Sequence, residues 1–158
     1  MHFTYLTPAY LRAVSTQIEF HPYTIAHLEP LLNLHAQHGI VTASYGALTP
    51  LLRHPSGGGP LVPILERIAS RLTSALKKPV EPTTVLLLWT RAQGAVVVTA
   101  TKNSEIIKKL GEIAALPDDL LEQSEIDEIT PVGKTIHFRH YGREQMEQNF
   151  AIPDLPSS

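Results

Sequence analysis

Three short segments carry the hydrophobic pattern of β-strands. Residues 17–20 alternate apolar and polar positions, so that Ile18 and Phe20 lie on one side of the predicted strand. Residues 39–46 are predicted to form a buried strand that ends at a glycine. The continuous apolar run 95–100 is typical of a parallel strand covered by helices. The sequence therefore predicts three strands.

Helices are predicted between and after these strands. Apolar residues at helical spacing are clearest in residues 25–37, which Gly39 ends, and in residues 61–76. The predicted helices, including a short one near the start, are 8–14, 25–37, 61–76, 82–93, 103–115 and 121–129. The order is strand, helix, strand, loop, two helices, strand and helix. This order predicts an α/β protein with a parallel sheet.

The composition is that of a single soluble domain. The chain has 158 residues, of which 43% are hydrophobic and 18% charged, and it contains no cysteine. A net charge of -2 gives no electrostatic reason to expect nucleic acid or an anionic membrane as a partner. The first residues lack the apolar core of a signal peptide, and no run approaches the length of a membrane span. We therefore expect a cytoplasmic protein.

Each predicted strand ends in small or polar residues. These ends are 17–21, 44–46 and 99–101. Because parallel strands place their carboxyl ends at the same edge of a sheet, the three ends would form one binding face. Ordinary loop polarity explains the same pattern equally well, so this observation alone leaves the function open.

Several segments resemble the carboxyl-terminal half of the aldo-keto reductases, in the fungal branch of that family. "QIEFHPY" (17–23) resembles the sixth strand, and "GIVTASYGALTPL" (39–51) resembles the seventh strand and its loop. Three later stretches match in order and spacing: "GGPLVPILERIASRL", "TTVLLLWTRAQGAVVVTATKNSEIIKKL" and "LLEQSEIDEIT". "GKTIHFRHY" resembles the C-terminal segment of the fungal branch. Several ordered motifs together are more specific than any one of them.

The resemblance implies a partial (β/α)8 barrel, with about three parallel strands and flanking helices. A complete barrel needs about 250 residues, which exceeds this chain. The resembling domain covers residues 1–145, and 146–158 would be a C-terminal tail. In the family, the catalytic Tyr, Asp, Lys and His belong to the amino-terminal part. No residue here matches them, so we predict no catalytic residue, and no metal site.

The resemblance also implies a nicotinamide cofactor, and the first part of its site lies on the first two strands. Gln17 would hydrogen-bond the carboxamide, and the ring of Tyr45 would stack on the nicotinamide. The backbone of Gly46, Ala47 and Leu48 would approach the ribose and pyrophosphate. The neighbouring residues Glu19, His21, Pro22 and Tyr23 are expected to shape the strand exit rather than to do chemistry.

The phosphate end of the cofactor site departs from the family pattern. Many members place a lysine and an arginine against the 2′-phosphate of NADP, and this chain has Ala100 and Ile106 there. Thr101, Lys102 and Asn103 remain candidate phosphate ligands beside a predicted helix N-terminus. Near the start, "MHF" also replaces the usual Ser-Asn-Phe. We expect NADP, with NAD as the alternative.

Three interpretations remain open from the sequence. In the first, the chain is the cofactor-binding half of an NAD(P)H-dependent reductase of small aldehydes or ketones, and it is inactive alone. In the second, it is a non-catalytic half-barrel that binds nucleotide weakly or self-associates through open sheet edges. In the third, it is a truncated gene product.

Overall fold

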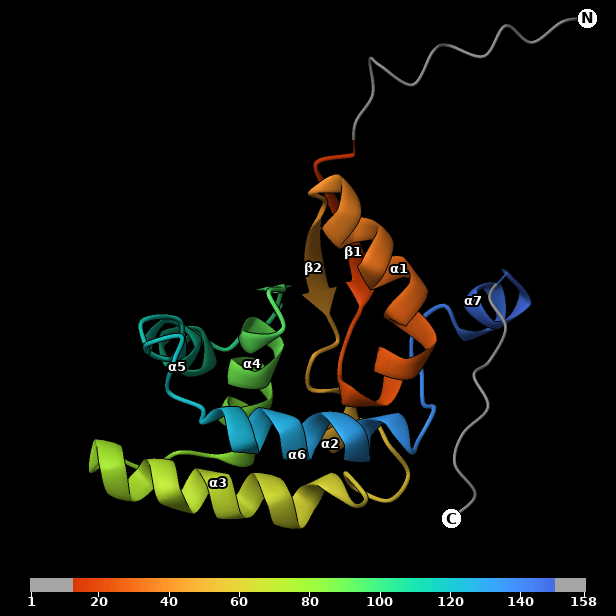
Figure 1. Cartoon of the computed structure of the whole chain (residues 1–158). Coiled ribbons are helices and arrows are strands. Elements are labelled where there is room, and N and C mark those ends of the chain that lie inside the picture. The colour runs from red at the N-terminus through yellow and green to blue at the C-terminus, as the bar shows by residue number, and fades with distance from the viewer. Residues whose placement is uncertain (1–12, 150–158) are drawn as a thin grey trace, which may run out of the picture.

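A three-stranded parallel sheet lies at the centre of the fold. The computed structural model describes residues 13–149, and Figure 1 shows the sheet with helices around it. The strands are β1 (Ser15–Glu19), β2 (Val41–Tyr45) and β3 (Val96–Val97), in the order β1-β2-β3. Gln17 is the register partner of Ala43, which in turn pairs with Val96, so these three side chains share one face of the sheet. The predicted α/β class and parallel sheet are confirmed.

Seven α-helices and one short 3-10 helix are described. They are η1 (Pro22–Thr24), α1 (Ile25–His38), α2 (Thr49–Leu52), α3 (Leu61–Leu76), α4 (Pro82–Ala92), α5 (Ser104–Ala114), α6 (Gln123–Lys134) and α7 (Arg143–Asn149). Figure 1 shows α1 running along β1 and β2, with α3 and α6 side by side across the carboxyl ends of these strands. No helix within residues 13–149 has the length and apolarity needed to cross a membrane.

The core lies on the helical side of the sheet and centres on α4. Residues 84–90 of this helix are all buried. The ring of Trp89 stacks on Phe20 at a centroid distance of 5.6 Å, and its indole N–H donates to Thr130 Oγ1 at 3.1 Å. Helix α3 adds the side chains of Leu61, Leu65, Ile68, Ala69 and Leu72, close to the apolar face that its periodicity predicts. Ile18 of β1 and Phe20, the residue that follows the strand, also enter this core.

Helix α6 is held to α3 by a partly buried ion pair. Arg71 donates from Nε and Nη2 to the two carboxylate oxygens of Glu125, each at 2.6 Å. A further bond from Arg71 Nη2 reaches the carbonyl of Leu120 at 3.1 Å. These two parallel hydrogen bonds fix both the distance and the relative orientation of the two side chains. As a result, Gly133 of α6 lies against Pro22 in η1, the first turn after β1.

The glycine-rich loop between α2 and α3 is fixed by Tyr23. The phenol of Tyr23 donates to the carbonyl of Gly58 at 2.5 Å, and burial raises the pKa of Tyr23 to about 12. Gly58 has a φ of +114°, and a Cβ there would approach Val62 and Leu51 within 2.8 Å. The segment "HPSGGGP" is therefore a packed loop of defined conformation.

The sheet differs from the prediction on its second face. The strand predicted over 95–100 is only Val96–Val97, and Val96 is 54% exposed. In β2, buried residues alternate with partly exposed ones, and Val41 is 43% exposed. An apolar run predicts cover on both faces, but among the described residues helices cover only one. The strand over 95–100 is therefore shorter than predicted, and the sheet is buried on one face, which leaves its other face open as a partial barrel requires.

The helix boundaries differ at proline and at short helices. The helix predicted over 121–129 is Gln123–Lys134 and continues through Pro131, because tertiary packing against α3 and η1 outweighs the loss of one backbone hydrogen bond. The short elements η1, α2 and α7 were not predicted. The helix predicted over 8–14 lies almost entirely outside the described residues, and residues 13 and 14 are not helical.

Substitution by alanine at two helical glycines should change the free energy of unfolding in opposite directions. A Cβ on Gly133 would lie 2.6 Å from Pro22 Cβ and 2.7 Å from its carbonyl oxygen, so Gly133→Ala should lower the free energy of unfolding by about 3 kcal/mol. A Cβ on Gly111 would meet no atom within 4 Å, so Gly111→Ala should raise it by about 0.5–1 kcal/mol. Urea unfolding followed by the fluorescence of Trp89 measures both. Equal effects of the two substitutions would contradict the packing of α6 on Pro22.

Candidate functional site

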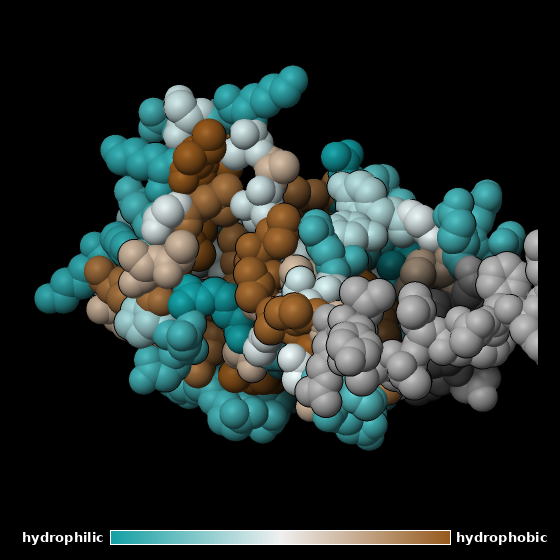
Figure 2. Space-filling model, turned by 90° about the horizontal axis from the view of Figure 1, so that it is seen from above, coloured by the Kyte–Doolittle hydropathy of each residue, from teal (hydrophilic) through white to brown (hydrophobic). Residues whose placement is uncertain are grey.

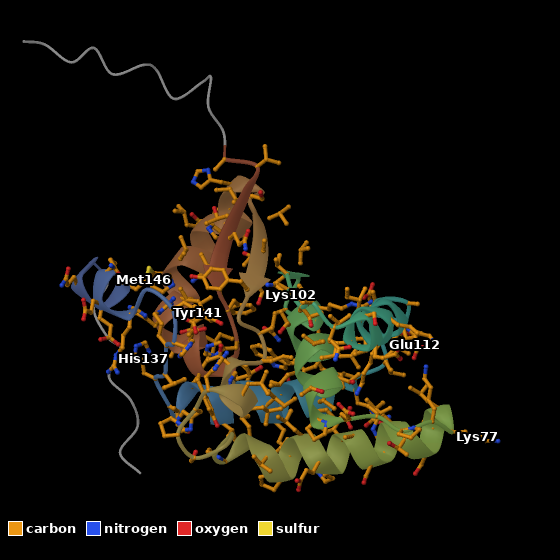
Figure 3. The ribbon with its side chains drawn as sticks, turned by 180° about the vertical axis from the view of Figure 1, so that it is seen from behind. Lys77, Lys102, Glu112, His137, Tyr141 and Met146 are labelled. Carbon is orange, nitrogen blue, oxygen red and sulfur yellow. The ribbon has the colours of Figure 1, made fainter. Side chains whose placement is uncertain are left out.

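A pocket opens at the carboxyl ends of the three strands. Its cavity is about 390 Å³. The lining residues come from all three strand ends and from the C-terminal segment: Gln17, Tyr45, Gly46, Ala47, Leu48, Val98, Thr99, Ala100 and Tyr141. In Figure 3, Tyr141 lies towards α7 and Lys102 towards α5. The face expected from the strand ends is thus a real concave site.

Two tyrosine rings and one free amide give the pocket its chemistry. The rings of Tyr45 and Tyr141 meet edge to face, with centroids 5.6 Å apart and an interplanar angle of 80°. Gln17 is exposed, and its side-chain amide has no hydrogen-bond partner among residues 13–149. An aromatic ring beside an unpaired amide suits a flat ligand that carries a polar group at its edge.

A tight turn after Tyr45 forms the floor of the pocket. Gly46 has a φ of +66°, and its carbonyl accepts from Thr49 N at 2.8 Å, which begins α2. A Cβ on Gly46 would lie 3.0 Å from Thr49 Oγ1 and 3.3 Å from both Tyr141 Cε2 and Glu19 Cγ. Only glycine combines this backbone conformation with such close neighbours. The turn places Gly46, Ala47 and Leu48 along the pocket.

The three residues predicted as phosphate ligands lie beyond the pocket, where β3 leads into α5. Asn103 is the N-cap of α5, and its side-chain oxygen accepts from Glu105 N at 2.9 Å and Ile106 N at 3.4 Å. The hydroxyl of Thr101 accepts from Asn103 N at 3.1 Å. Lys102 is exposed and forms no ion pair within the described part of the chain. The side chains of Thr101 and Asn103 are therefore engaged in the turn, and the ammonium group of Lys102 remains available to a ligand.

Helix α5 is fixed mainly at its C-terminal end. Arg91 of α4 donates to the carbonyls of Ile113 at 3.1 Å and Leu116 at 2.9 Å, and it also pairs with Asp118. These bonds satisfy carbonyls that a helix end leaves without partners. The N-terminal half of α5 has no such anchor among the described residues, and Ile106 and Ile107 are 45% and 56% exposed.

A second, smaller cavity adjoins the first. It has a volume of about 190 Å³ and is mostly apolar. Its lining residues are Leu48, Glu81, Thr83, Leu87, Ile106, Lys109, Leu110 and Ile113. Glu81 and Lys109 form an ion pair at its rim. Leu48 lines both cavities, so a single extended ligand could contact both.

A buried polar cluster supports the pocket from below. Glu19, at the end of β1, is fully buried and accepts from the backbone N–H groups of His140 at 2.9 Å and Tyr141 at 3.0 Å. Its carboxylate also lies 3.3 Å from His21 Nε2 and 3.5 Å from Arg139 Nη1. Burial by itself would raise the pKa of Glu19, but the hydrogen bonds from His21, His140 and Tyr141 outweigh it and lower the pKa. Glu19 is therefore an anion at neutral pH.

The histidines around this carboxylate are kept neutral. Burial lowers the pKa of His21, although Glu19 opposes this shift. Burial also lowers the pKa of His137, and the neighbouring ring of His27, 4.9 Å away, acts in the same direction. Arg139 pairs with Glu19, and the cluster also contains Glu147, whose carboxylate lies 3.4 Å from His137 Nε2. The cluster joins β1, α1 and the C-terminal segment.

The structure brings together five of the eight residues predicted for the site. Gln17, Tyr45, Gly46, Ala47 and Leu48 line one pocket, and Thr101, Lys102 and Asn103 follow it along the chain. Tyr141 was not predicted, because nothing in the local sequence indicates which strand end the C-terminal segment contacts. The burial of Glu19 was also missed, since an acidic residue on the polar side of a predicted strand is normally solvated.

Comparison with known proteins confirms the resemblance to aldo-keto reductases. The chain is 29% identical over 131 residues to the NAD/NADP-dependent indole-3-acetaldehyde reductase of Schizosaccharomyces pombe, matching 83% of this chain and 42% of that protein. The chain thus spans less than half the length of this curated relative. No protein-family model matches it.

Solved structures show the same fold. The aldo/keto reductase of Brucella melitensis superposes with a TM-score of 0.55 at 26% identity, over 74% of this chain and 38% of that structure. A candidate 2,5-diketo-D-gluconic acid reductase B superposes with a TM-score of 0.53 at 22% identity, over 79% and 40%. The fold is therefore part of a (β/α)8 barrel, in which three parallel strands form an open sheet with flanking helices.

The free energy of unfolding should decrease on acidification in two stages. Because the pKa of His21 and His137 is lowered from 6.5 in the folded protein, the unfolded chain binds more protons below about pH 6.5, and stability falls there. The pKa of Glu19 is lowered from 4.5, so its contribution is present above that pH and is lost as the pH falls further.

Urea titrations between pH 7.5 and pH 4 measure this dependence. His137→Gln should reduce the decrease between pH 7 and pH 5.5. His38→Gln, at an exposed position on α1, is the matched control and should leave the decrease unchanged. Stability that stays constant down to pH 5 would contradict the burial of neutral histidines in this cluster.

Proposed function

We propose that this chain binds a nicotinamide dinucleotide as part of an oxidoreductase that reduces an aldehyde or ketone to an alcohol. The observation that carries the proposal is the pocket, in which the Tyr45 ring and the unpaired Gln17 amide face one cavity at the carboxyl ends of parallel strands. In barrel enzymes, this end of the sheet is where catalysis takes place. The resemblance to an NAD/NADP-dependent aldehyde reductase supports the same function.

The residues present fit the nicotinamide end of the cofactor. The Tyr45 ring offers an apolar plane for stacking, and the Gln17 amide carries both the donor and the acceptor that a carboxamide requires. The turn at Gly46 leaves backbone exposed where the ribose would lie. Leu48 then leads to the apolar cavity beside Ile106, which suits the flat adenine ring.

The fit is weaker at the 2′-phosphate. Ile106 and Ala100 are apolar where many relatives carry cations, and Lys109 is paired with Glu81. Lys102 is the unpaired lysine next to the pocket within the described residues, and it projects from an exposed turn at the start of α5. We therefore propose that the chain accepts NADP and NAD with similar affinity.

In this function the chain orients the cofactor. The cofactor supplies hydride to the carbonyl carbon of a small aldehyde or ketone. Tyr45 fixes the plane of the ring, and Gln17 fixes its rotation within that plane. The pocket also needs an acid that protonates the carbonyl oxygen, and no lysine that could activate a tyrosine lines it within the described residues. We propose that the polypeptide completing the barrel supplies this acid.

A second candidate function rests on the uncovered face of the sheet. Val41, Val96 and Val98, on or next to β2 and β3, are exposed apolar residues, and Figure 2 shows hydrophobic patches on the side of the molecule seen from above. Parallel sheets are normally covered on both faces. A non-catalytic module that self-associates through this face would also explain it.

Nucleotide affinity should depend more on Tyr45 than on Lys102. Loss of the stacking plane in Tyr45→Ala should weaken NADPH binding about 2- to 10-fold. Lys102→Ala removes one solvent-screened charge and should weaken it about 5-fold or less. Calorimetric titration of the two variants and the wild type gives the comparison. If Lys102→Ala abolishes binding and Tyr45→Ala does not, the ligand lies at the start of α5 and our placement of the nicotinamide is wrong.

The 158-residue chain alone should bind nucleotide without turning over a carbonyl substrate. The reason is the lack of an activated acid among the described residues that line the pocket. NADPH oxidation is monitored at saturating aldehyde, with the heat-denatured chain as the control. Turnover above that control would show that the pocket already contains its acid. No nucleotide binding, together with a dimeric mass in light scattering, would favour the second candidate function.

A further inference from the structure

The segment that carries Tyr141 reaches the pocket through one buried carboxylate. Glu19 Oε1 accepts from the backbone N–H of His140, and Glu19 Oε2 accepts from the backbone N–H of Tyr141. Two successive backbone N–H groups thus donate hydrogen bonds to the two oxygens of one carboxylate, as in the backbone nests that bind anions. The bonds measure 2.9 Å and 3.0 Å, which are normal lengths for N–H···O hydrogen bonds.

This carboxylate has no access to solvent. Glu19 is 0% exposed, and the remaining groups around it are His21 from the turn after β1 and Arg139 from the C-terminal segment. A buried anion is costly unless it is paired and hydrogen-bonded. The C-terminal segment supplies two backbone donors and one cation, so its docking and the burial of Glu19 depend on each other.

Contacts of Phe138, the residue before Arg139, also hold the C-terminal segment in place. Phe138 N donates to the carbonyl of Tyr23 at 3.0 Å, and the ring of Phe138 packs edge-on against His54 at 4.8 Å. These contacts hold the segment near η1 but lie before Arg139. The hydrogen bonds to Glu19 are therefore the last fixed point before Tyr141 enters the pocket.

The position of Tyr141 determines the shape of the pocket. Its ring meets Tyr45 at 80°, and the same ring lies 3.3 Å from the position that a Cβ on Gly46 would take. The neighbouring Glu19 Cγ lies equally close to that position. Glu19, Gly46 and Tyr141 thus pack against one another, and the Tyr141 ring in turn contacts the Tyr45 ring.

We propose that Glu19 is a positioning residue of the pocket, which holds Tyr141 edge-on to Tyr45 and so fixes the width of the slot available to a flat ligand. Glu19 does not touch the ligand in this arrangement and acts through Tyr141. The ligand itself rests on the proposed function, in which it is a nicotinamide dinucleotide. Whether Glu19 fixes Tyr141 can be measured without any ligand.

The first test is amide hydrogen exchange in the absence of nucleotide. In the wild type, the amides of His140 and Tyr141 should be protected. In Glu19→Gln, which keeps the shape but loses the charge and one acceptor, their exchange should accelerate about 10-fold or more relative to Leu65 in the core. Glu112→Gln, on the exposed surface of α5, is the matched control and should change neither.

The outcomes of this test are distinct. Rapid exchange at His140 and Tyr141 in the wild type overturns the proposal, and this measurement remains valid if Glu19→Gln does not fold. Equal acceleration at Leu65 and Tyr141 would mean that Glu19 serves global stability only, which also overturns it. Faster exchange at the amides of His140 and Tyr141, with exchange at Leu65 unchanged, supports the proposal.

The second test is a double-mutant cycle with NADPH. Glu19→Gln and Tyr141→Ala should each weaken binding about 2- to 10-fold, because each removes the edge contact below Tyr45. The double variant should bind no more weakly than Tyr141→Ala alone, since Glu19 acts through that side chain. Additive effects would overturn the proposal. If the wild type binds no nucleotide, the proposed function fails, while the exchange measurements still decide the role of Glu19.

Discussion

The bond between the Glu19 carboxylate and the backbone of His140 and Tyr141 joins parts of the chain that are 121 and 122 residues apart. It ties the end of the first described strand to the segment that follows the last large helix. Because the carboxylate is fully buried, the bond exists only when β1, η1 and this segment are all in place. Tyr141, which lines the pocket, is itself one of the two donors, so this bond is the proposed determinant of the pocket's shape.

The sheet imposes the second constraint. Three parallel strands bury one face against α1 and α4 and leave the other open within the described residues, with Val96 54% exposed. In a closed barrel the open face would be the interior, which side chains from the remaining strands fill. The same geometry that leaves this surface open places Gln17 and Tyr45 at its rim. The proposed cofactor site and the uncovered sheet face are therefore parts of one surface.

The sequence predicts the features that depend on local pattern. Helix α3 follows from the spacing of Leu65, Ile68 and Leu72, and α5 begins within one residue of the start predicted at 103. Features set by distant contacts could not be predicted. Nothing local shows that α6 continues through Pro131, that β3 is only two residues long, or that Tyr141 enters the pocket.

In the proposed function, a nicotinamide dinucleotide binds at the carboxyl ends of the three strands. Titration of NADPH into isotope-labelled protein, followed by amide chemical shifts, locates the bound nucleotide. We expect saturable shifts at Gly46, Ala47, Thr99 and Tyr141, and none at Gln93 and Asp127, which line a separate surface hollow between α4 and α6. Shifts confined to Gln93 and Asp127, or no saturable shifts at all, would contradict the proposed function.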